Sequence, residues 1–256
     1  MGKIISIVNQ KGGVGKTTTA INLGAYLANL GKQVLLVDID PQANATSGLG
    51  IEVNNLEAGI YEVLLDAKPV GRVIKKTRQT GYEVLPANPA LAGAGVELVQ
   101  MEEREWRLSK ILQEIKNDYD YIIIDGPPSL GLLTVNSLVA AEEILIPIQS
   151  EYYSLEGLGQ LLETIDLVRE NLKPDLKVKG AVVTMYDKRN RLSGLVMNEL
   201  RDHFPHQIFE TVIPRNVRLA ESPSFGKTIY YYDKNSKGAQ AYEKLAREII
   251  QSDKED

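Results

Sequence analysis

The chain has 256 residues, of which 43% are hydrophobic and 25% charged, the balance of a globular protein that can build a large core. It has no cysteine and only two histidines, which excludes disulfides, thiolate metal sites and thiol nucleophiles and disfavours a histidine-based zinc site. The net charge of −5 repels nucleic acid at long range, so any DNA binding must come from a local basic patch.

The opening segment MGKIISIVNQ is an apolar run too short for a signal-peptide core, and it leads directly into a glycine-rich loop. No stretch approaches the roughly 20 apolar residues that a membrane-spanning helix needs. The sequence therefore predicts a cytoplasmic protein. Because no repeat or Pro/Gly-rich linker interrupts it, we also expect one domain over residues 1–256, with no DNA-reading domain ahead of the first strand.

Short runs rich in isoleucine and valine alternate with amphipathic stretches. The runs predicted as strands are Ile4–Val8, Val34–Val37, Tyr121–Ile124, Ile144–Ile148, Val178–Thr184 and Ile208–Ile213, with a weaker candidate at Tyr82–Pro86. Their nearly continuous hydrophobicity is typical of strands that are buried on both faces.

Helical patterns lie between these runs. A helix from about Thr17 is expected to end at Gly31, a usual stop residue. Two more helices are indicated by one-sided apolar residues: Leu108, Ile111, Leu112 and Ile115 in one, and Leu155, Leu158, Leu161, Leu162, Ile165 and Val168 in the other. This alternation predicts an α/β fold with a mostly parallel central sheet and helices on both faces. In such sheets ligands bind at the carboxyl ends of the strands.

The first predicted strand runs into a glycine-rich loop, and a helix follows. Glycines let backbone N–H groups contact phosphate oxygens without interference from a Cβ, and the helix N-terminus adds partial positive charge. The loop residues predicted to bind ATP are Lys11, Gly12, Gly13, Val14, Gly15, Lys16, Thr17 and Thr18. Lys16 can reach the β- and γ-phosphates, and the Thr17 hydroxyl can ligate Mg²⁺. The alternative is a glycine-rich turn without a ligand. The position of Gly-Lys-Thr between a strand and a helix favours a P-loop, and hence a P-loop NTPase fold.

Two of the predicted strands end in aspartate at the ligand edge. Asp38 and Asp40 close the second strand and face the same way, since side chains alternate along a strand. Asp125 closes the strand YIIID. One carboxylate can hold Mg²⁺ through water, and another can orient an attacking water. Each aspartate alone could equally cap a helix or close a turn. Their occurrence together with the loop indicates an Mg²⁺–nucleotide site.

The loop departs from the standard G-x-x-x-x-G-K-[ST] pattern because Gln10 replaces the first glycine and a lysine follows, giving KGGVGKTT. This is the deviant P-loop, and it resembles that of the ParA/MinD group of ATPases. The segments DIDPQ at 38–42 and DGPP at 125–128 resemble further nucleotide motifs of that group, although Gly126 replaces the commoner cysteine or threonine. Residues 147–158, 182–193 and 212–229 are similar to chromosomal ParA/Soj proteins.

The resemblance implies a role for each of these positions. Lys11 would reach across a dimer interface to the phosphates of the other subunit, with a solvated loop lysine as the alternative. Asp40 would position the hydrolytic water beside the catalytic Lys11 and Lys16, Asp125 would bind Mg²⁺ through water, and Asp38 would support the site. The loop beside the adenine would be Pro214, Arg215 and Asn216.

The resemblance also implies a function. It describes an Mg²⁺-dependent ATPase that forms a homodimer around ATP, and that a ParB-type centromere-binding protein stimulates. The cellular role would be segregation of chromosome or plasmid DNA.

Basic residues gather in three parts of the sequence, and those predicted to contact DNA are Lys188, Arg189, Arg218, Lys227, Lys234 and Lys237. No helix-turn-helix or zinc-finger signature is present, so phosphate contact without sequence preference is expected rather than base readout. From the residues alone, ordinary solvated charges are an equal alternative. The family resemblance favours DNA at Arg189 and Arg218, and with it a nucleoid-associated protein. Since a dimer doubles the patch, we hypothesise that ATP controls DNA binding through dimerisation.

Two other classes share the P-loop. A MinD-like membrane ATPase would insert a C-terminal amphipathic helix, for which Leu245, Ile249 and Ile250 could form the stripe. The acidic end, with Asp253 and Asp256, would meet anionic lipid, so we expect that helix to dock on the core and no membrane partner. A small-molecule ligase would not be expected to combine the loop lysine with DPQAN at 40–44 and ESPSFGK at 221–227.

Overall fold

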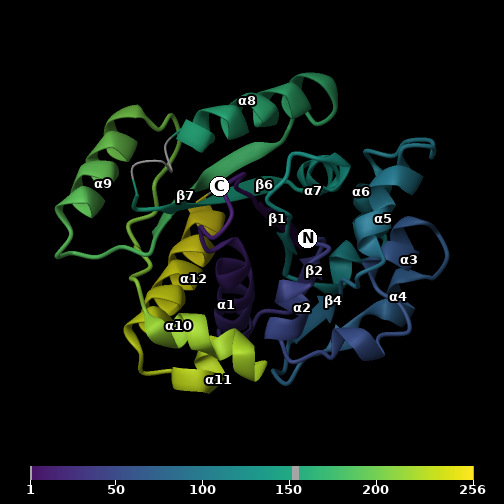
Figure 1. Cartoon of the computed structure of the whole chain (residues 1–256), viewed down its shortest axis with the longest axis horizontal. Coiled ribbons are helices and arrows are strands. Elements are labelled where there is room, and N and C mark those ends of the chain that lie inside the picture. The colour runs from purple at the N-terminus through teal and green to yellow at the C-terminus, as the bar shows by residue number, and fades with distance from the viewer. Residues whose placement is uncertain (1, 152–155, 256) are drawn as a thin grey trace.

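A computed structural model describes residues 2–151 and 156–255. Seven strands form one sheet in the order β3-β4-β2-β5-β1-β6-β7 (Figure 1). The strands are β1 Lys3–Ile7, β2 Val34–Asp38, β3 Lys75–Lys76, β4 Tyr82–Leu85, β5 Tyr121–Asp125, β6 Glu143–Gln149 and β7 Lys177–Thr184. Every neighbouring pair is parallel except β3 with β4, which is antiparallel.

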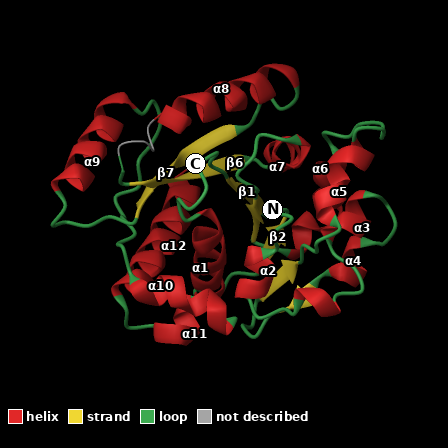
Figure 2. Cartoon of the chain, in the orientation of Figure 1, coloured by secondary structure: helices red, strands yellow, loops and turns green. Residues whose placement is uncertain are grey.

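Helices occupy the connections between the strands (Figure 2). They are α1 Lys16–Asn29, α2 Asn44–Gly48, α3 Ile60–Leu64, α4 Val70–Val73, α5 Leu91–Leu98, α6 Arg107–Ile115, α7 Leu132–Ala140, α8 Glu156–Asn171, α9 Arg191–His203, α10 Val217–Glu221, α11 Ile229–Asp233 and α12 Lys237–Glu255.

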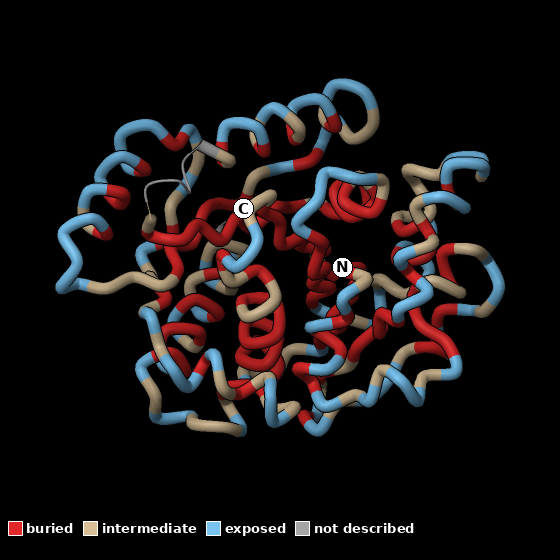
Figure 3. Tube along the Cα trace, in the orientation of Figure 1, coloured by how far each residue is buried: buried red, intermediate tan, exposed pale blue. Residues whose placement is uncertain are grey.

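Each central strand contributes to two separate cores, one on each face of the sheet. In β2, Leu35 and Val37 belong to one core, whereas Val34 and Leu36 belong to the other. The first core also contains side chains of α3 and α5 to α9, and the second contains side chains of α1, α2 and α10 to α12. Figure 3 shows α1 buried along most of its length. Because side chains alternate along a strand, burial on both faces requires the continuous hydrophobic runs of the sequence. The predicted α/β fold is confirmed.

Most of the predicted elements are present. The weaker candidate Tyr82–Pro86 forms β4 beside β2. The first helix ends at Asn29, and Gly31 adopts the left-handed backbone conformation at φ 86° that favours glycine there. The apolar faces of α6 and α8 pack into the core, except that the predicted member Leu155 lies outside the described residues.

The prediction of a strand at Ile208–Ile213 was wrong. This segment makes ladder bonds only near its two ends, where Phe209 N donates to Ala181 O over 2.9 Å and Ile213 N donates to Val183 O over 2.8 Å. Between them, the N–H groups of Glu210 and Thr211 donate to the carboxylate of Glu248 on α12, over 2.7 and 3.2 Å. A side-chain acceptor from a distant helix thus replaces the strand partner. The short antiparallel β3 was not predicted.

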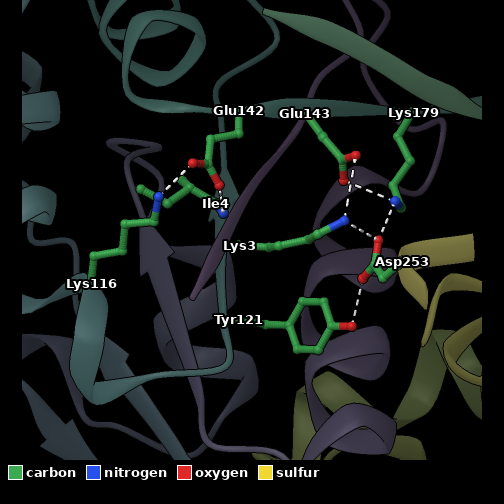
Figure 4. A network of polar contacts seen from close by, with 8 residues as sticks. All are labelled: Lys3, Ile4, Lys116, Tyr121, Glu142, Glu143, Lys179 and Asp253. Atoms are coloured by element: carbon green, nitrogen blue, oxygen red, sulfur yellow. Dashed lines mark hydrogen bonds and ion pairs between the residues drawn. The ribbon is translucent and has the colours of Figure 1, made fainter. Parts of the chain in front are cut away.

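The amino edge of the sheet carries a buried cluster of charges (Figure 4). Asp253 near the end of α12 accepts hydrogen bonds from Lys3 at 2.7 Å, Lys179 at 2.5 Å and the Tyr121 hydroxyl at 2.6 Å. Glu143 also pairs with Lys179, at 2.8 Å. The side chain of Lys179 is 2% exposed. These contacts fasten the end of α12 to the starts of β1, β5, β6 and β7.

The apolar stripe predicted for the C-terminal helix faces the core, where Leu245 and Ile249 are fully buried. The expectation that this helix docks on the fold is confirmed. Among the described residues, no helix is long and apolar enough to cross a membrane.

The strand order decides where the predicted nucleotide-binding segments of the sequence meet. β1 lies between β5 and β6, and β2 lies on the other side of β5. In the sheet register Asp125 is opposite both Ile7 and Asp38. The glycine-rich loop after β1 and the aspartates that end β2 and β5 therefore share the carboxyl edge of the sheet.

Candidate functional site

The glycine-rich loop after β1 has the backbone conformation that its sequence predicts. Gly13 and Gly15 have φ values of 75° and 91°, the left-handed region that favours glycine. A Cβ on Gly12 or Gly13 would meet nothing within 4 Å, so open space lies beside this part of the loop. Val14 is fully buried and anchors the loop to the protein. The loop is therefore anchored through Val14, while Gly12 and Gly13 face open space near the start of α1.

Contacts with the strands β6 and β7 hold this loop in place. Asn9 donates from Nδ2 to the carbonyl of Pro147 in β6 over 2.8 Å, and its Oδ1 accepts from Lys11 N at 3.0 Å. Thr184 at the end of β7 donates to Val14 O over 2.8 Å. Neither Asn9 nor Thr184 was predicted as a site residue. Their contacts depend on the placement of β6 and β7 beside the loop, and no local pattern carries that information.

The two lysines of the loop lie in different environments. Lys16 is 7% exposed, and its Nζ donates to the backbone carbonyl of Lys11 over 3.1 Å. Burial lowers the pKa of Lys16, while the charges of Asp125 and Asp40 act to raise it. No carboxylate of the described residues forms an ion pair with Lys16. Lys11 is half-buried, and among the described residues its ammonium group has no hydrogen-bond or ion-pair partner. An anionic ligand would therefore satisfy both ammonium groups.

Asp125 is the most unusual group of the site. The residue is fully buried, yet neither carboxylate oxygen has a hydrogen-bond partner in the described part of the chain. Burial, followed by the charge of Asp38, raises the pKa of Asp125 well above its usual value. The nearby Thr17 hydroxyl acts in the opposite direction, although its contact falls outside hydrogen-bond geometry. Buried carboxylates are normally paired or coordinate a cation. The position thus fits a divalent ion between Asp125 and Thr17.

Asp38 is saturated by protein contacts instead. Its Oδ2 accepts from Thr46 N at 2.8 Å and from Thr46 Oγ1 at 2.7 Å, and its Oδ1 accepts from Asp40 N at 3.2 Å. Burial raises the pKa of Asp38 to about 6, although these hydrogen bonds oppose the shift. Thr46 in turn accepts from Ala87 N at 2.9 Å, which ties α2 to the segment after β4. The supporting role expected of Asp38 stays a prediction. Thr46 was missed, because it lies in a separate short helix.

Asp40 lies in a turn at the mouth of the site. Its Oδ1 accepts from Gln42 N at 2.9 Å, and its carbonyl accepts from Ala43 N at 2.9 Å. Ala43 has a left-handed backbone at φ 51° directly before α2. Asp40 therefore does close a turn, which is one of the alternatives that the sequence left open. Among the described residues, this turn engages only Oδ1 of the Asp40 carboxylate, and Asp40 stays close enough for its charge to act on Lys16.

The predicted adenine loop lies along the same edge of the sheet. Tyr186, two residues beyond Thr184, donates from its backbone to Ile213 O over 3.0 Å and accepts from Arg215 N over 3.2 Å. Arg215 forms an ion pair with Glu151 at 3.4 Å. Asn216 caps α10 by accepting from Leu219 N at 3.3 Å. Residues 152–155 of the family-like segment 147–158 lie outside the described residues.

The basic residues predicted to contact DNA come from the loop before α9, from α10, and from the region of α11 and α12. Arg189 has a side chain that is 91% exposed, and it pairs with Asp187 at 3.2 Å. Arg218 pairs with Glu221 at 3.0 Å and with Asp233 at 3.7 Å. Lys188, Lys234 and Lys237 are exposed, whereas Lys227 is half-buried. DNA phosphates would have to compete with carboxylates at both arginines.

A bound metal would need ligand atoms beyond the protein's own. Among the described residues, no three His, Cys, Asp or Glu side chains gather as a metal-binding group. Magnesium commonly binds through one or two protein ligands, with substrate phosphates and waters completing its shell. Asp125 and Thr17 at the edge of the glycine loop are suited to that arrangement.

The chain resembles known proteins over nearly its whole length. The family model described as an AAA domain matches residues 2–178. The chain is 55% identical over 249 residues to the sporulation initiation inhibitor protein Soj of Bacillus subtilis (strain 168), covering 97% of this chain and 98% of that protein. It is 54% identical over 253 residues to the chromosome partitioning protein ParA of Myxococcus xanthus (strain DK1622), covering 99% of this chain and 89% of that protein.

A solved structure shows the same fold. The chain aligns with a TM-score of 0.88 and 38% identity to a cobyrinic acid a,c-diamide synthase from Mycobacterium smegmatis with bound ADP and magnesium, covering 99% of this chain and 96% of that one.

Proposed function

The chain belongs to the ParA/Soj family of chromosome-partitioning ATPases, and from that premise we propose that it hydrolyses ATP to ADP and phosphate as an Mg²⁺-dependent homodimer. In the ATP state the dimer binds DNA without sequence preference. A ParB-type partner stimulates hydrolysis, and the cycle of ATP binding and hydrolysis segregates chromosome or plasmid DNA. The protein acts in the cytoplasm, where it associates with the nucleoid. The observation that carries the ATPase assignment is Asp125, a buried carboxylate beside an intact P-loop that has no hydrogen-bond partner in the described part of the chain.

The residues present fit both ATP and Mg²⁺. The loop from Lys11 to Thr18 would hold the phosphates, and the loop Pro214–Asn216 would lie beside the adenine. Thr17, together with Asp125 through water, would hold Mg²⁺. When bound, Mg²⁺ neutralises charge on the phosphates. Lys16 adds positive charge from within the subunit, and its lowered pKa reflects a burial cost that an anionic ligand offsets.

The position of Asp40 supports its proposed role in hydrolysis. It lies at the mouth of the site, and its Oδ1 already accepts one backbone hydrogen bond, which fixes the direction of the carboxylate. A carboxylate held in this way can align an attacking water. The turn around Asp40 therefore serves catalysis as well as local structure.

Lys11 is proposed to complete the site of the other subunit. Replacing Lys11 by alanine is expected to keep the protein monomeric with a non-hydrolysable ATP analogue, because the analogue's phosphates then lose the cation that the partner supplies. Sedimentation velocity with ATP analogue, ADP and no nucleotide measures this. Lys75→Ala, which removes an exposed lysine from the short edge strand β3, is the matched control and should dimerise like the parent. A Lys11→Ala protein that dimerises as tightly as the parent would contradict the shared-site proposal.

DNA binding should follow from dimerisation. With ATP, the Asp40→Ala protein is expected to bind several duplexes of unrelated sequence with similar affinity. That affinity should be at least about tenfold higher than without ATP, since a dimer meets twice as many phosphates. The logarithmic salt dependence should steepen by about 0.9 for each added phosphate contact. Fluorescence anisotropy with duplexes of unrelated sequence, across a salt series, measures both quantities. A strong preference for one duplex would overturn the non-specific mode.

A MinD-like membrane role is the alternative, and α12 argues against it. The apolar stripe of α12 is buried in the core, and Asp253 ties the end of the helix to the sheet. An inserting helix would have to break those contacts. Flotation with anionic liposomes in the presence of ATP separates the two functions: the proposed function expects no ATP-dependent recovery of protein with the vesicles.

A further inference from the structure

One hydrogen bond joins the P-loop to the strand that leads into the candidate DNA-binding loop. Thr184, the last residue of β7, donates from Oγ1 to Val14 O over 2.8 Å, and both residues are buried. The Thr184 side chain also lies against the start of α1, because a Cβ added to Gly15 would meet it at 3.7 Å. The position of Thr184 therefore depends directly on the position of the P-loop backbone.

The chain beyond Thr184 is held from several sides. Met185 has a left-handed backbone at φ 52°, a strained conformation for a non-glycine residue that persists only where the surroundings impose it. Those surroundings include Ser150, whose Oγ donates to Met185 O over 3.2 Å and whose backbone N–H donates to Thr184 O over 3.1 Å. Tyr186 is then fixed by its backbone contacts with Ile213 and Arg215. Because these hydrogen bonds hold residues 185 and 186 to their neighbours, a displacement of Thr184 is not absorbed locally. It is passed on to the residues that follow.

The next residues carry exposed positive charge. Lys188 and Arg189 follow within five positions of Thr184, and the turn is closed by Asp187, which accepts from Arg189 N at 3.0 Å. Asn190 caps α9 by accepting from Leu192 N. In Figure 1 the chain passes from β7 to α9 on the side of the molecule that also carries α10 and α11. The helix α10, which contains the predicted DNA contact Arg218, therefore lies on the same side as the loop 185–190.

We propose that Thr184 is a positioning residue that couples the nucleotide state of the P-loop to the placement of the loop 185–190. The proposal rests on the proposed function and adds to it: dimerisation sets how many basic loops meet DNA, and Thr184 sets how each loop is presented. In this proposal the P-loop backbone shifts when it takes up phosphates, and the Val14–Thr184 hydrogen bond transmits that shift to the end of β7. Coupling of this kind is reciprocal, so DNA must tighten nucleotide binding by the factor by which nucleotide tightens DNA binding.

The test uses the full chain in the Asp40→Ala background. Thr184→Val keeps the side-chain shape and removes only the hydroxyl donor, while Thr184→Ser keeps the donor. The measured quantity is the ratio of DNA affinities with and without ATP, alongside sedimentation to record the dimer. We expect Thr184→Val to reduce that ratio about tenfold, which corresponds to about 1.4 kcal/mol of coupling, with ATP-dependent dimerisation retained. Thr184→Ser should keep the ratio of the parent.

The outcomes separate this proposal from the proposed function. If Thr184→Val keeps the full ratio, dimerisation alone accounts for the switch and the role of Thr184 is overturned. If the Asp40→Ala parent itself shows no gain in DNA affinity with ATP, the proposed function fails instead. Should Thr184→Val fail to fold in a thermal-unfolding assay, Ser150→Ala removes the hydroxyl that holds the Met185 carbonyl. It should lower the ratio in the same direction, and an unchanged ratio in Ser150→Ala would overturn the proposal.

Discussion

Replacing Asp125 by asparagine is expected to stabilise the nucleotide-free protein and to abolish its Mg²⁺-dependent ATP hydrolysis. The carboxylate is fully buried without a hydrogen-bond partner among the described residues. Leaving such a group unsatisfied costs about 1–3 kcal/mol or more when it is charged, so a neutral amide of the same shape should raise the free energy of unfolding by about that amount. The same amide removes the charge that would hold the metal, and ATP hydrolysis should fall by at least about 10²-fold.

The pH dependence of this gain has a defined sign. The pKa of Asp125 is raised well above its usual value by burial and by Asp38. In the unfolded chain the carboxyl loses its proton near its ordinary pKa of 3.8, whereas in the folded protein it keeps the proton to higher pH. The wild-type protein thus loses stability as pH rises through the interval between these two values. The advantage of Asp125→Asn should be largest at neutral pH and shrink as pH falls toward 4.

Urea unfolding at several pH values, without nucleotide, measures this prediction, and steady-state phosphate release measures the loss of activity. Asp118→Asn, at an exposed position just before β5, is the matched control and should change neither quantity. A lower stability of Asp125→Asn at neutral pH would mean that the carboxylate has a stabilising partner, and the argument for a metal position there would be lost.

Replacing Asp253 by asparagine is expected to lower the free energy of unfolding, the opposite of Asp125→Asn, and to leave ATP binding unchanged. The side chain of Asp253 is 8% exposed and that of Lys179 is 2% exposed, so the substitution leaves a buried ammonium group with fewer anionic contacts. Breaking a buried ion pair from one side costs about 3–5 kcal/mol, and we expect about 3 kcal/mol because Glu143 still pairs with Lys179. ATP affinity should be unchanged, since the cluster lies at the amino edge of the sheet and the site at the carboxyl edge.

The control for this prediction is an exposed ion pair. Asp175 pairs with Lys173 at 3.1 Å with a side chain that is 73% exposed, and Asp175→Asn should cost below about 1 kcal/mol. For Asp253, burial would raise the pKa, but hydrogen bonds from Lys179, Lys3 and Tyr121 lower it below the ordinary value. Its stabilising contribution is therefore present above pH 4 or so and is lost as pH falls through the lowered pKa. Equal losses from Asp253→Asn and Asp175→Asn in urea unfolding would contradict the structural role of the cluster.

Strands were predicted correctly from the sequence where burial alone set the hydrophobic pattern of the segment. Strands such as β1 and β5 are buried on both faces, so most of their residues are apolar, and this signal is local. The segment Ile208–Ile213 has a similar composition but follows a different course, because Glu248 from α12 takes its central N–H groups. Hydrophobicity is visible along the chain, but competition for a backbone donor from a residue far away in sequence is not.

By itself, the sequence determined the phosphate loop. The left-handed conformations of Gly13 and Gly15, and the direction of Lys16 along the first turn of α1, follow from neighbouring residues. It also determined that aspartates end two strands. Tertiary packing leaves Asp125 without a hydrogen-bond partner among the described residues and saturates Asp38 through Thr46. It also brings Thr184 to the loop across 170 positions of sequence. The physical reason is that backbone conformation is set by local sterics, whereas burial and hydrogen-bond satisfaction are properties of which strands become neighbours.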